Sequence, residues 1–164
     1  MSQPSTRSKY DIDQQITIDA AAEAVWKWVA TDTDLELSWR NIDGRGVQSL
    51  ERLDDGELEV GSRFRGTVQM GAGEPKVYVN EVTAVTPHRH IAWKTIESDG
   101  ALSGLGEYDV EPIGGGTRFR IKLDYPPKSL LGRIQRPIVR LVGGRFISKM
   151  LEKLKRSVEA GAQA

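Results

Sequence analysis

The two histidines of the chain, His88 and His90, are the first candidates for catalysis or metal binding. They flank Arg89 and follow Pro87, which places them in a turn. An imidazole could act as a general base or bind zinc, but two ligands do not complete a metal site, and no neighbouring carboxylate pattern supplies a third. We therefore interpret both histidines as solvated turn residues, and we expect no metal and no cofactor.

Two carboxylates, Glu51 and Glu97, continue apolar alternations, in residues 47–53 and 91–95 respectively. A carboxyl group that faces an apolar cavity has a raised pKa and can transfer protons. The competing interpretation, which we favour, places each glutamate at a strand end, where the inward face of the strand meets water.

Other catalytic patterns are missing from the sequence. It contains no cysteine, no Ser-His-Asp arrangement and no HExxH motif. The glycines at 114–116 precede an alternating strand pattern rather than a helix, so they indicate a hairpin turn and not a phosphate-binding loop. The residues leave enzymatic activity undecided, and we favour a protein that is not an enzyme.

Three tryptophans are the largest candidates for an interior surface. Trp26 lies on the inner stripe of a predicted helix and is expected in the core. Trp93, in the middle of a predicted strand, could line either a core or a pocket, because both are apolar. Trp39 follows a predicted short helix and could contact a ligand.

The elements that would position these residues alternate between strand and helix patterns. Period-two alternation and turn residues predict seven strands, and period-3.6 spacing predicts two short helices after the first strand. The strands are predicted at 10–18, 47–53, 63–70, 76–86, 90–97, 101–111 and 117–125, and the helices at 20–30 and 31–39. The pattern slips at Val82, which indicates a β-bulge.

The C-terminal segment carries the longest helical pattern. Because proline suits a first helical position, Pro137 predicts a short helix at 128–136 followed by a longer one at 137–160. Its apolar residues are expected on one side, against the sheet, with the basic residues opposite. They are Leu130, Ile134, Ile138, Leu141, Val142, Phe146 or Ile147, Met150, Leu154 and Val158.

This order of elements predicts an α+β fold. Short connections make the strands an antiparallel meander, and a sheet of seven strands curls, so its concave side needs an apolar filling. The C-terminal helix offers it. We expect a single domain over residues 10–160, a disordered N-terminus at 1–9 and a flexible tail at 161–164.

Several short motifs in this order resemble the START-like, or SRPBCC, helix-grip superfamily. That superfamily includes polyketide cyclases/dehydrases, pollen-allergen-type ligand carriers and lipid-transfer domains. The resemblance covers roughly residues 10–160. It is carried by IDAAAEAVW at 18–26, Asp32, Trp39, VGSRF at 60–64, VTP at 85–87, GGTRF at 115–119 and the final helix.

The resemblance implies a cavity between helix and sheet for a hydrophobic or amphipathic small molecule, with Trp39 near its mouth. Binding or transport of such a molecule is the leading hypothesis, and a polyketide cyclase/dehydratase-type reaction in the same cavity is the alternative. The same fold serves enzymes and non-enzymes. The expected lining residues are Trp39, Phe64, Val68, Val79, Trp93, Thr95, Tyr108, Phe119, Ile121, Leu123, Phe146 and Met150.

The formal net charge of zero conceals two unlike segments. Residues 128–164 contain nine Lys or Arg and two acidic residues, so they carry +7 and the rest of the chain carries −7. A basic helix with an apolar arc suits an anionic membrane surface, so peripheral contact through 128–146 is a second alternative. We favour a solvated or internally packed face instead.

No aromatic residues interleave with the basic ones, so we expect no nucleic-acid partner. With no apolar leader or membrane span in the sequence, we expect a cytoplasmic monomer or homodimer.

Overall fold

A computed structural model of the chain describes residues 10–30, 46–69, 73–99, 103–126 and 130–162. At 30, 46, 130–132, 135, 139 and 162 only the backbone is described. The elements, in chain order, are β1 (Ile12–Ile18), α1 (Ala22–Ala30), β2 (Gly46–Arg52), β3 (Arg63–Gln69), β4 (Lys76–Thr86), β5 (His90–Ser98), β6 (Leu105–Ile113), β7 (Gly116–Asp124) and α3 (Leu130–Ala162).

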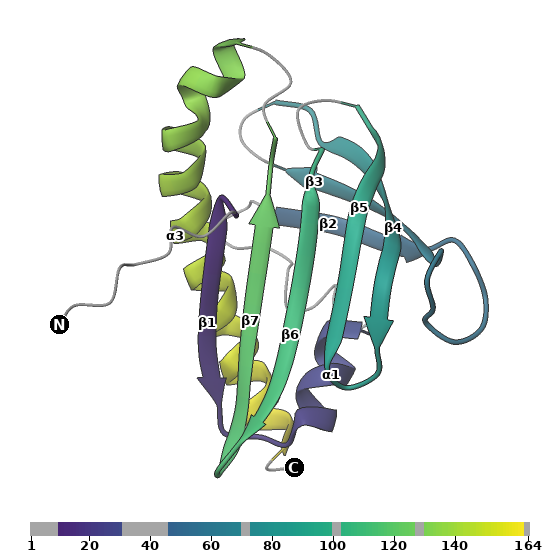
Figure 1. Cartoon of the computed structure of the whole chain (residues 1–164), viewed down its shortest axis with the longest axis vertical. Helices are drawn as coiled ribbons and strands as arrows, with labels where there is room; N and C mark the ends of the chain where they lie inside the picture. The colour runs from purple at the N-terminus through teal and green to yellow at the C-terminus, as the bar shows by residue number, and fades with distance from the viewer. Residues whose placement is uncertain (1–9, 31–45, 70–72, 100–102, 127–129, 163–164) are drawn as a thin grey trace, which may run out of the picture.

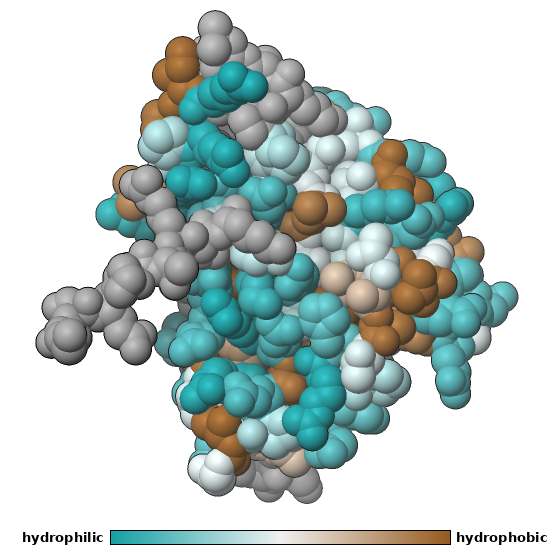
Figure 2. Space-filling model, in the orientation of Figure 1, coloured by the Kyte–Doolittle hydropathy of each residue, from teal (hydrophilic) through white to brown (hydrophobic). Residues whose placement is uncertain are grey.

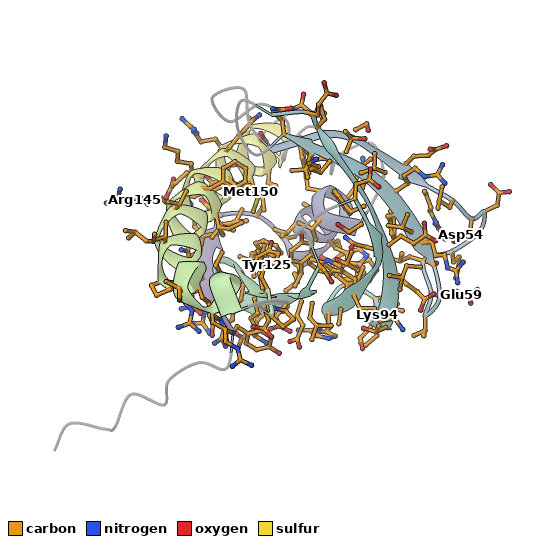
Figure 3. The ribbon with its side chains drawn as sticks, turned by 90° about the horizontal axis from the view of Figure 1, so that it is seen from above. Asp54, Glu59, Lys94, Tyr125, Arg145 and Met150 are labelled. Carbon is orange, nitrogen blue, oxygen red and sulfur yellow. The ribbon has the colours of Figure 1, made fainter. Side chains whose placement is uncertain are left out.

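The seven strands form one antiparallel sheet in the order β1-β7-β6-β5-β4-β3-β2. The sheet curls so strongly that β2 and β3 cross behind the other strands (Figure 1). Viewed from above, α3 lies on one side of a ring and the curled sheet forms the rest (Figure 3). The predicted α+β helix-grip fold is confirmed.

The core lies between the sheet, α1 and the C-terminal half of α3. On β7 the predicted alternation is confirmed, because Phe119, Ile121 and Leu123 are buried while the residues between them are partly exposed. Opposite them, α3 buries Ile147, Met150, Leu151, Leu154 and Val158, and α1 buries Ala22, Val25 and Val29.

The C-terminal helix differs from its prediction in two ways. Residues 130–162 form one continuous helix with Pro137 inside it, so the predicted break at that residue is wrong. The apolar residues also do not share one side. Ile134, Ile138, Leu141 and Val142 are 54–69% exposed, whereas Ile147 and Met150 are buried.

Helical geometry explains the second difference. An α-helix turns by about 100° per residue, so Ile147, thirteen residues after Ile134, lies about 220° further round the axis. The two apolar runs therefore face opposite directions, and only the second run faces the sheet.

Some predictions fall outside the described residues: the short helix at 31–39 with Trp39, the N-terminal segment 1–9, and residues 163 and 164. Gly161 and Ala162 belong to α3, so the helix extends further than the predicted end at 160. Among the described residues, no helix is long and apolar enough to cross a membrane.

Candidate ligand-binding site

Two aromatic side chains lie flat over glycines on the inner face of the sheet. A Cβ atom added to Gly66 of β3 would come within 2.2–2.7 Å of the Tyr78 ring, and one added to Gly106 of β6 within 2.1–2.7 Å of the Trp93 ring. These pairs are direct cross-strand neighbours. The two glycines thus provide the space in which the rings lie against the sheet.

The pairing of β4 with β3 decides which residues of the first part of β4 face inward. The register shifts between Val79 and Asn80 and again between Val82 and Ala84, and the second shift confirms the bulge predicted at Val82. Tyr78 pairs with inward-facing Gly66, whereas Val79 pairs with Arg65. By this pairing Val77 and Val79 share the face of Arg65, although Val79 is only 4% exposed. Its place in the lining stays a prediction.

Asn80 and Thr95 add a polar pair to the inner face. Thr95 Oγ1 donates a hydrogen bond of 2.9 Å to Asn80 Oδ1 and accepts one of 3.3 Å from the backbone N–H of Gly104. Both side chains are only partly buried, so they retain surface that a ligand could contact.

Tyr125 completes the group from the end of β7. It continues the inward alternation of Phe119, Ile121 and Leu123, and its ring packs against the core while keeping some exposed surface. Figure 3 shows it in the centre of the space between α3 and the sheet, with Met150 on the side of the helix. Tyr125 thus lies opposite α3, on the interior side of the sheet.

The phenol groups at this end of the molecule are neutral hydrogen-bond donors. Burial, together with the nearby charge of Asp11, raises the pKa of Tyr125 to about 12. Burial and the proximity of Tyr125 also raise the pKa of Tyr78, far above its usual range. Neither side-chain hydroxyl has a hydrogen-bond partner among the described residues, although both rings keep accessible surface.

The predicted lining residues fall into three groups. Phe119 and Ile121 have no accessible surface and form the sealed core. Phe64, Val68, Tyr108, Leu123 and Met150 are 1–8% exposed and nearly sealed. Trp93, Thr95 and Phe146 keep substantial surface. Trp93 contacts Tyr108 with 4.5 Å between the centres of their tilted rings, and Tyr108 in turn contacts Phe119 at 5.3 Å. The accessible inner surface therefore lies towards Trp93, away from Phe119.

Beside this surface, ion pairs hold α3 against the start of β1. The carboxylate of Asp11, which is 1% exposed, accepts hydrogen bonds from Arg136 Nε at 2.7 Å, Arg140 Nε at 2.6 Å and the backbone N–H of Tyr125 at 3.0 Å. Arg136 also reaches Asp124 at 3.1 Å. Burial alone would raise the pKa of Asp11, but the hydrogen bonds from Arg136, Tyr125 and Arg140 lower it overall.

Both histidines lie away from the inner surface. His90 pairs through Nδ1 with Asp109 Oδ1 at 2.7 Å on the outer face of the sheet, and His88 is exposed in its turn. A shallow pocket of about 390 Å³ opens on the same outer face and is lined by Gln15, Arg89, Asp109, Val110, Glu111, Arg118 and Arg120. Glu51 and Glu97 are exposed as well. In the described part of the chain, no group of three or more His, Asp or Glu residues could hold a metal ion.

Sequence reasoning missed Tyr78, Asn80, Tyr125 and the Asp11 cluster. The alternation of β7, extended by one step beyond Leu123, could have identified Tyr125. Tyr78 and Asn80 could not have been found in this way, because apolar Val77 and Val79 indicate the opposite phase for this part of β4.

Comparison with solved structures supports the fold. A protein from Thermus thermophilus matches with a TM-score of 0.72 and 20% identity, covering 92% of this chain and 98% of that one. A Deinococcus radiodurans protein matches with a TM-score of 0.65 and 24% identity, covering 92% and 97%. The Zhui aromatase/cyclase from Streptomyces sp. R1128 matches with a TM-score of 0.67 and 17% identity, covering 90% and 92%.

A comparison with curated protein sequences finds no significant match. Residues 9–159, which span nearly the whole chain, match the sequence model of a family described as polyketide cyclase/dehydrase and lipid transport. Together with the curled sheet, the long C-terminal helix and the aromatic inner surface, this match shows that the chain belongs to the polyketide cyclase/dehydrase and lipid-transport family.

Proposed function

We propose that the protein binds and carries a small, largely apolar molecule that bears a hydrogen-bond acceptor such as a ketone. The molecule would lie between α3 and the sheet, against Trp93 and Phe146. Its polar group would face Tyr78 and Tyr125. Phe119 and Ile121, which were expected to line the cavity, would in this proposal belong to the packed core beneath the ligand.

The observation that carries this proposal is the state of the two phenols. Both are desolvated enough for their pKa values to rise, yet both rings keep accessible surface and neither hydroxyl has a partner among the described residues. Neither hydroxyl oxygen is a sealed atom, so each reaches accessible space without a fixed partner. A bound molecule with an acceptor atom would supply one.

A cyclase/dehydratase-type reaction in the same place remains the alternative. A neutral phenol can donate a hydrogen bond to a carbonyl oxygen and stabilise the negative charge that develops on it during proton abstraction or ring closure. The described inner surface offers hydrogen-bond donors for this reaction but no unpaired carboxylate or imidazole that could act as the base. The carboxylate of Asp11 is neutralised by two arginines. Carriage is therefore the leading proposal.

Binding of a matched pair of probes tests the proposal. Tryptophan fluorescence is titrated with α-tetralone, a bicyclic ketone, and with tetralin, the hydrocarbon of the same shape. We expect α-tetralone to bind more tightly, and we expect Tyr78→Phe and Tyr125→Phe each to weaken its binding about two- to ten-fold, the loss of one hydrogen bond. Tetralin binding should not change.

Tyr10→Phe is the matched control. Tyr10 donates its hydroxyl to Glu107 on the outer face, so this variant loses a phenol without changing the interior. If neither probe binds, or if all three variants bind α-tetralone as well as the original protein, the proposed site is wrong. Conversion of a poly-β-ketone probe to a cyclised product, lost in Tyr125→Phe, would favour the enzyme instead.

A further inference from the structure

The first half of α3 carries an apolar stripe that the domain does not cover. Ile134, Ile138, Leu141 and Val142 are 69%, 64%, 59% and 54% exposed. Their successive spacings of four, three and one residues place them on one side of the helix. Figure 2 shows brown, apolar atoms on the outer edge of the upper part of α3, beside teal, hydrophilic ones.

Ion pairs fix the direction of this stripe. Arg136 and Arg140 lie on the other side of the same turns and bind Asp11, whose carboxylate is buried. Gln14 donates a hydrogen bond to the carbonyl of Gly144 at 2.9 Å, so β1 also holds the middle of the helix. The polar side of this half therefore faces the domain and the apolar side faces out.

Positive charge accompanies the exposed stripe. Arg145 is exposed and has no acidic partner in the part of the chain that the structure describes. Arg145 falls close to the azimuth of Ile134 and Ile138, since eleven residues turn a helix by three turns and about 20°. The first acidic residue after Asp124 is Glu152, so no carboxylate interrupts residues 133–149.

We propose that this face of α3, defined by Ile134, Ile138, Leu141, Val142 and Arg145, docks onto an anionic lipid surface. Apolar side chains on a helix gain free energy by entering the boundary between headgroups and acyl chains, and arginines beside them attract anionic headgroups. Both requirements are met on one side of one helix.

A second copy of the chain fits this face less well. In a twofold-symmetric dimer the same surface contacts itself, so both copies of Arg145 would enter one interface that supplies no acidic residue. Like charges facing each other without an acid oppose such an association. A lipid surface supplies the missing negative charge instead.

Co-sedimentation with vesicles tests the proposal. Phosphatidylcholine vesicles are compared with vesicles of phosphatidylcholine and phosphatidylglycerol, at low and high salt. We expect binding to the anionic vesicles only, weakened by salt because screening shortens the reach of the arginine charges. We expect Arg145→Glu to weaken binding at least five-fold, since one basic residue contributes roughly 1 kcal/mol, and Ile138→Ser to weaken it by a comparable factor.

Two matched control variants test whether a loss of vesicle binding is specific to this face of α3. Val60→Ser replaces a side chain of nearly equal exposure, 62%, in the connection between β2 and β3, and Arg89→Glu reverses an exposed charge in the turn between β4 and β5. Both controls should bind vesicles unchanged. All four sites are exposed, so each variant should melt within a few degrees of the original protein.

Three results would overturn the proposal: no binding to anionic vesicles at low salt, equal losses in the controls, or equal binding to neutral vesicles. A dimer in analytical ultracentrifugation that Ile138→Ser converts to monomer, without vesicle binding, would assign the face to a second copy.

Discussion

Arg136 on α3 and Asp11, directly before β1, form an ion pair with 2.7 Å between Nε and Oδ1, although 125 residues separate them in the chain. This contact makes the first half of α3 pack by its polar side. Arg140 reaches the same carboxylate, so two basic residues of this half of the helix share one acid.

Removal of the Asp11 charge should destabilise the fold. In Asp11→Asn two arginines lose their shared acceptor at a carboxylate that is almost completely buried, so we expect a loss of about 1–3 kcal/mol in the free energy of unfolding. Urea denaturation measures it. Glu111→Gln, which removes an exposed partner of Arg118, is the control and should cost less than about 0.5 kcal/mol. Equal losses in the two variants would contradict the role of Asp11.

The pH dependence of the unfolding free energy should reveal the titration of the Asp11 carboxylate. The pKa of Asp11 lies below its usual value of 3.8, so the unfolded chain binds its proton more readily than the native protein. Its contribution is present above about pH 4 and is lost as the pH falls through 3.8 and below. Unfolding free energies measured from pH 6 downward should therefore fall less steeply in Asp11→Asn. Part of this fall in unfolding free energy should remain in Asp11→Asn, because other carboxyl groups also have lowered pKa values. They are Asp109, Glu107 and Asp54. Identical slopes would show that Asp11 titrates alike in both states.

The two faces of β7 should respond differently to substitution. Ile121 has no exposed surface, so Ile121→Asp buries a carboxylate without a partner and should cost about 4 kcal/mol or more. Arg120→Gln loses only the partly exposed pair with Asp13 at 2.6 Å and should cost about 1 kcal/mol or less. Guanidinium denaturation compares them, and the reverse ranking would place β7 one residue out of register.

The ring of Trp93 should need the space over Gly106 in order to lie against the sheet. In Gly106→Ala the new methyl group would lie 2.1 Å from the indole ring, so the ring must move, at a cost of about 1–3 kcal/mol. Tryptophan emission and near-ultraviolet circular dichroism should change with it. Gly114→Ala is the control, because no atom lies within 4 Å of its added methyl group. Unaltered spectra in Gly106→Ala would mean that Trp93 does not lie against β6.

Local patterns were sufficient for the seven strands, for α1 and for most of the core. Period-two alternation is a property of neighbouring residues, so Phe119, Ile121 and Leu123 could be placed inward from the sequence alone. The stripe of Met150, Leu154 and Val158 follows equally from helical spacing. Short connections then required an antiparallel sheet, and its curl required a filling helix.

Contacts between distant residues decided what those patterns left open. Helical periodicity shows which residues share a side but not which side meets the domain, and Asp11 made that choice for the first half of α3. Likewise, the pairing of β4 with β3 placed Tyr78 and Asn80 on the inward face of Gly66 and Phe64, and Val79 on the face of Arg65. A register depends on the pairing of two strands, which neither strand specifies alone, so the polar end of the candidate site emerged only when the sheet was assembled.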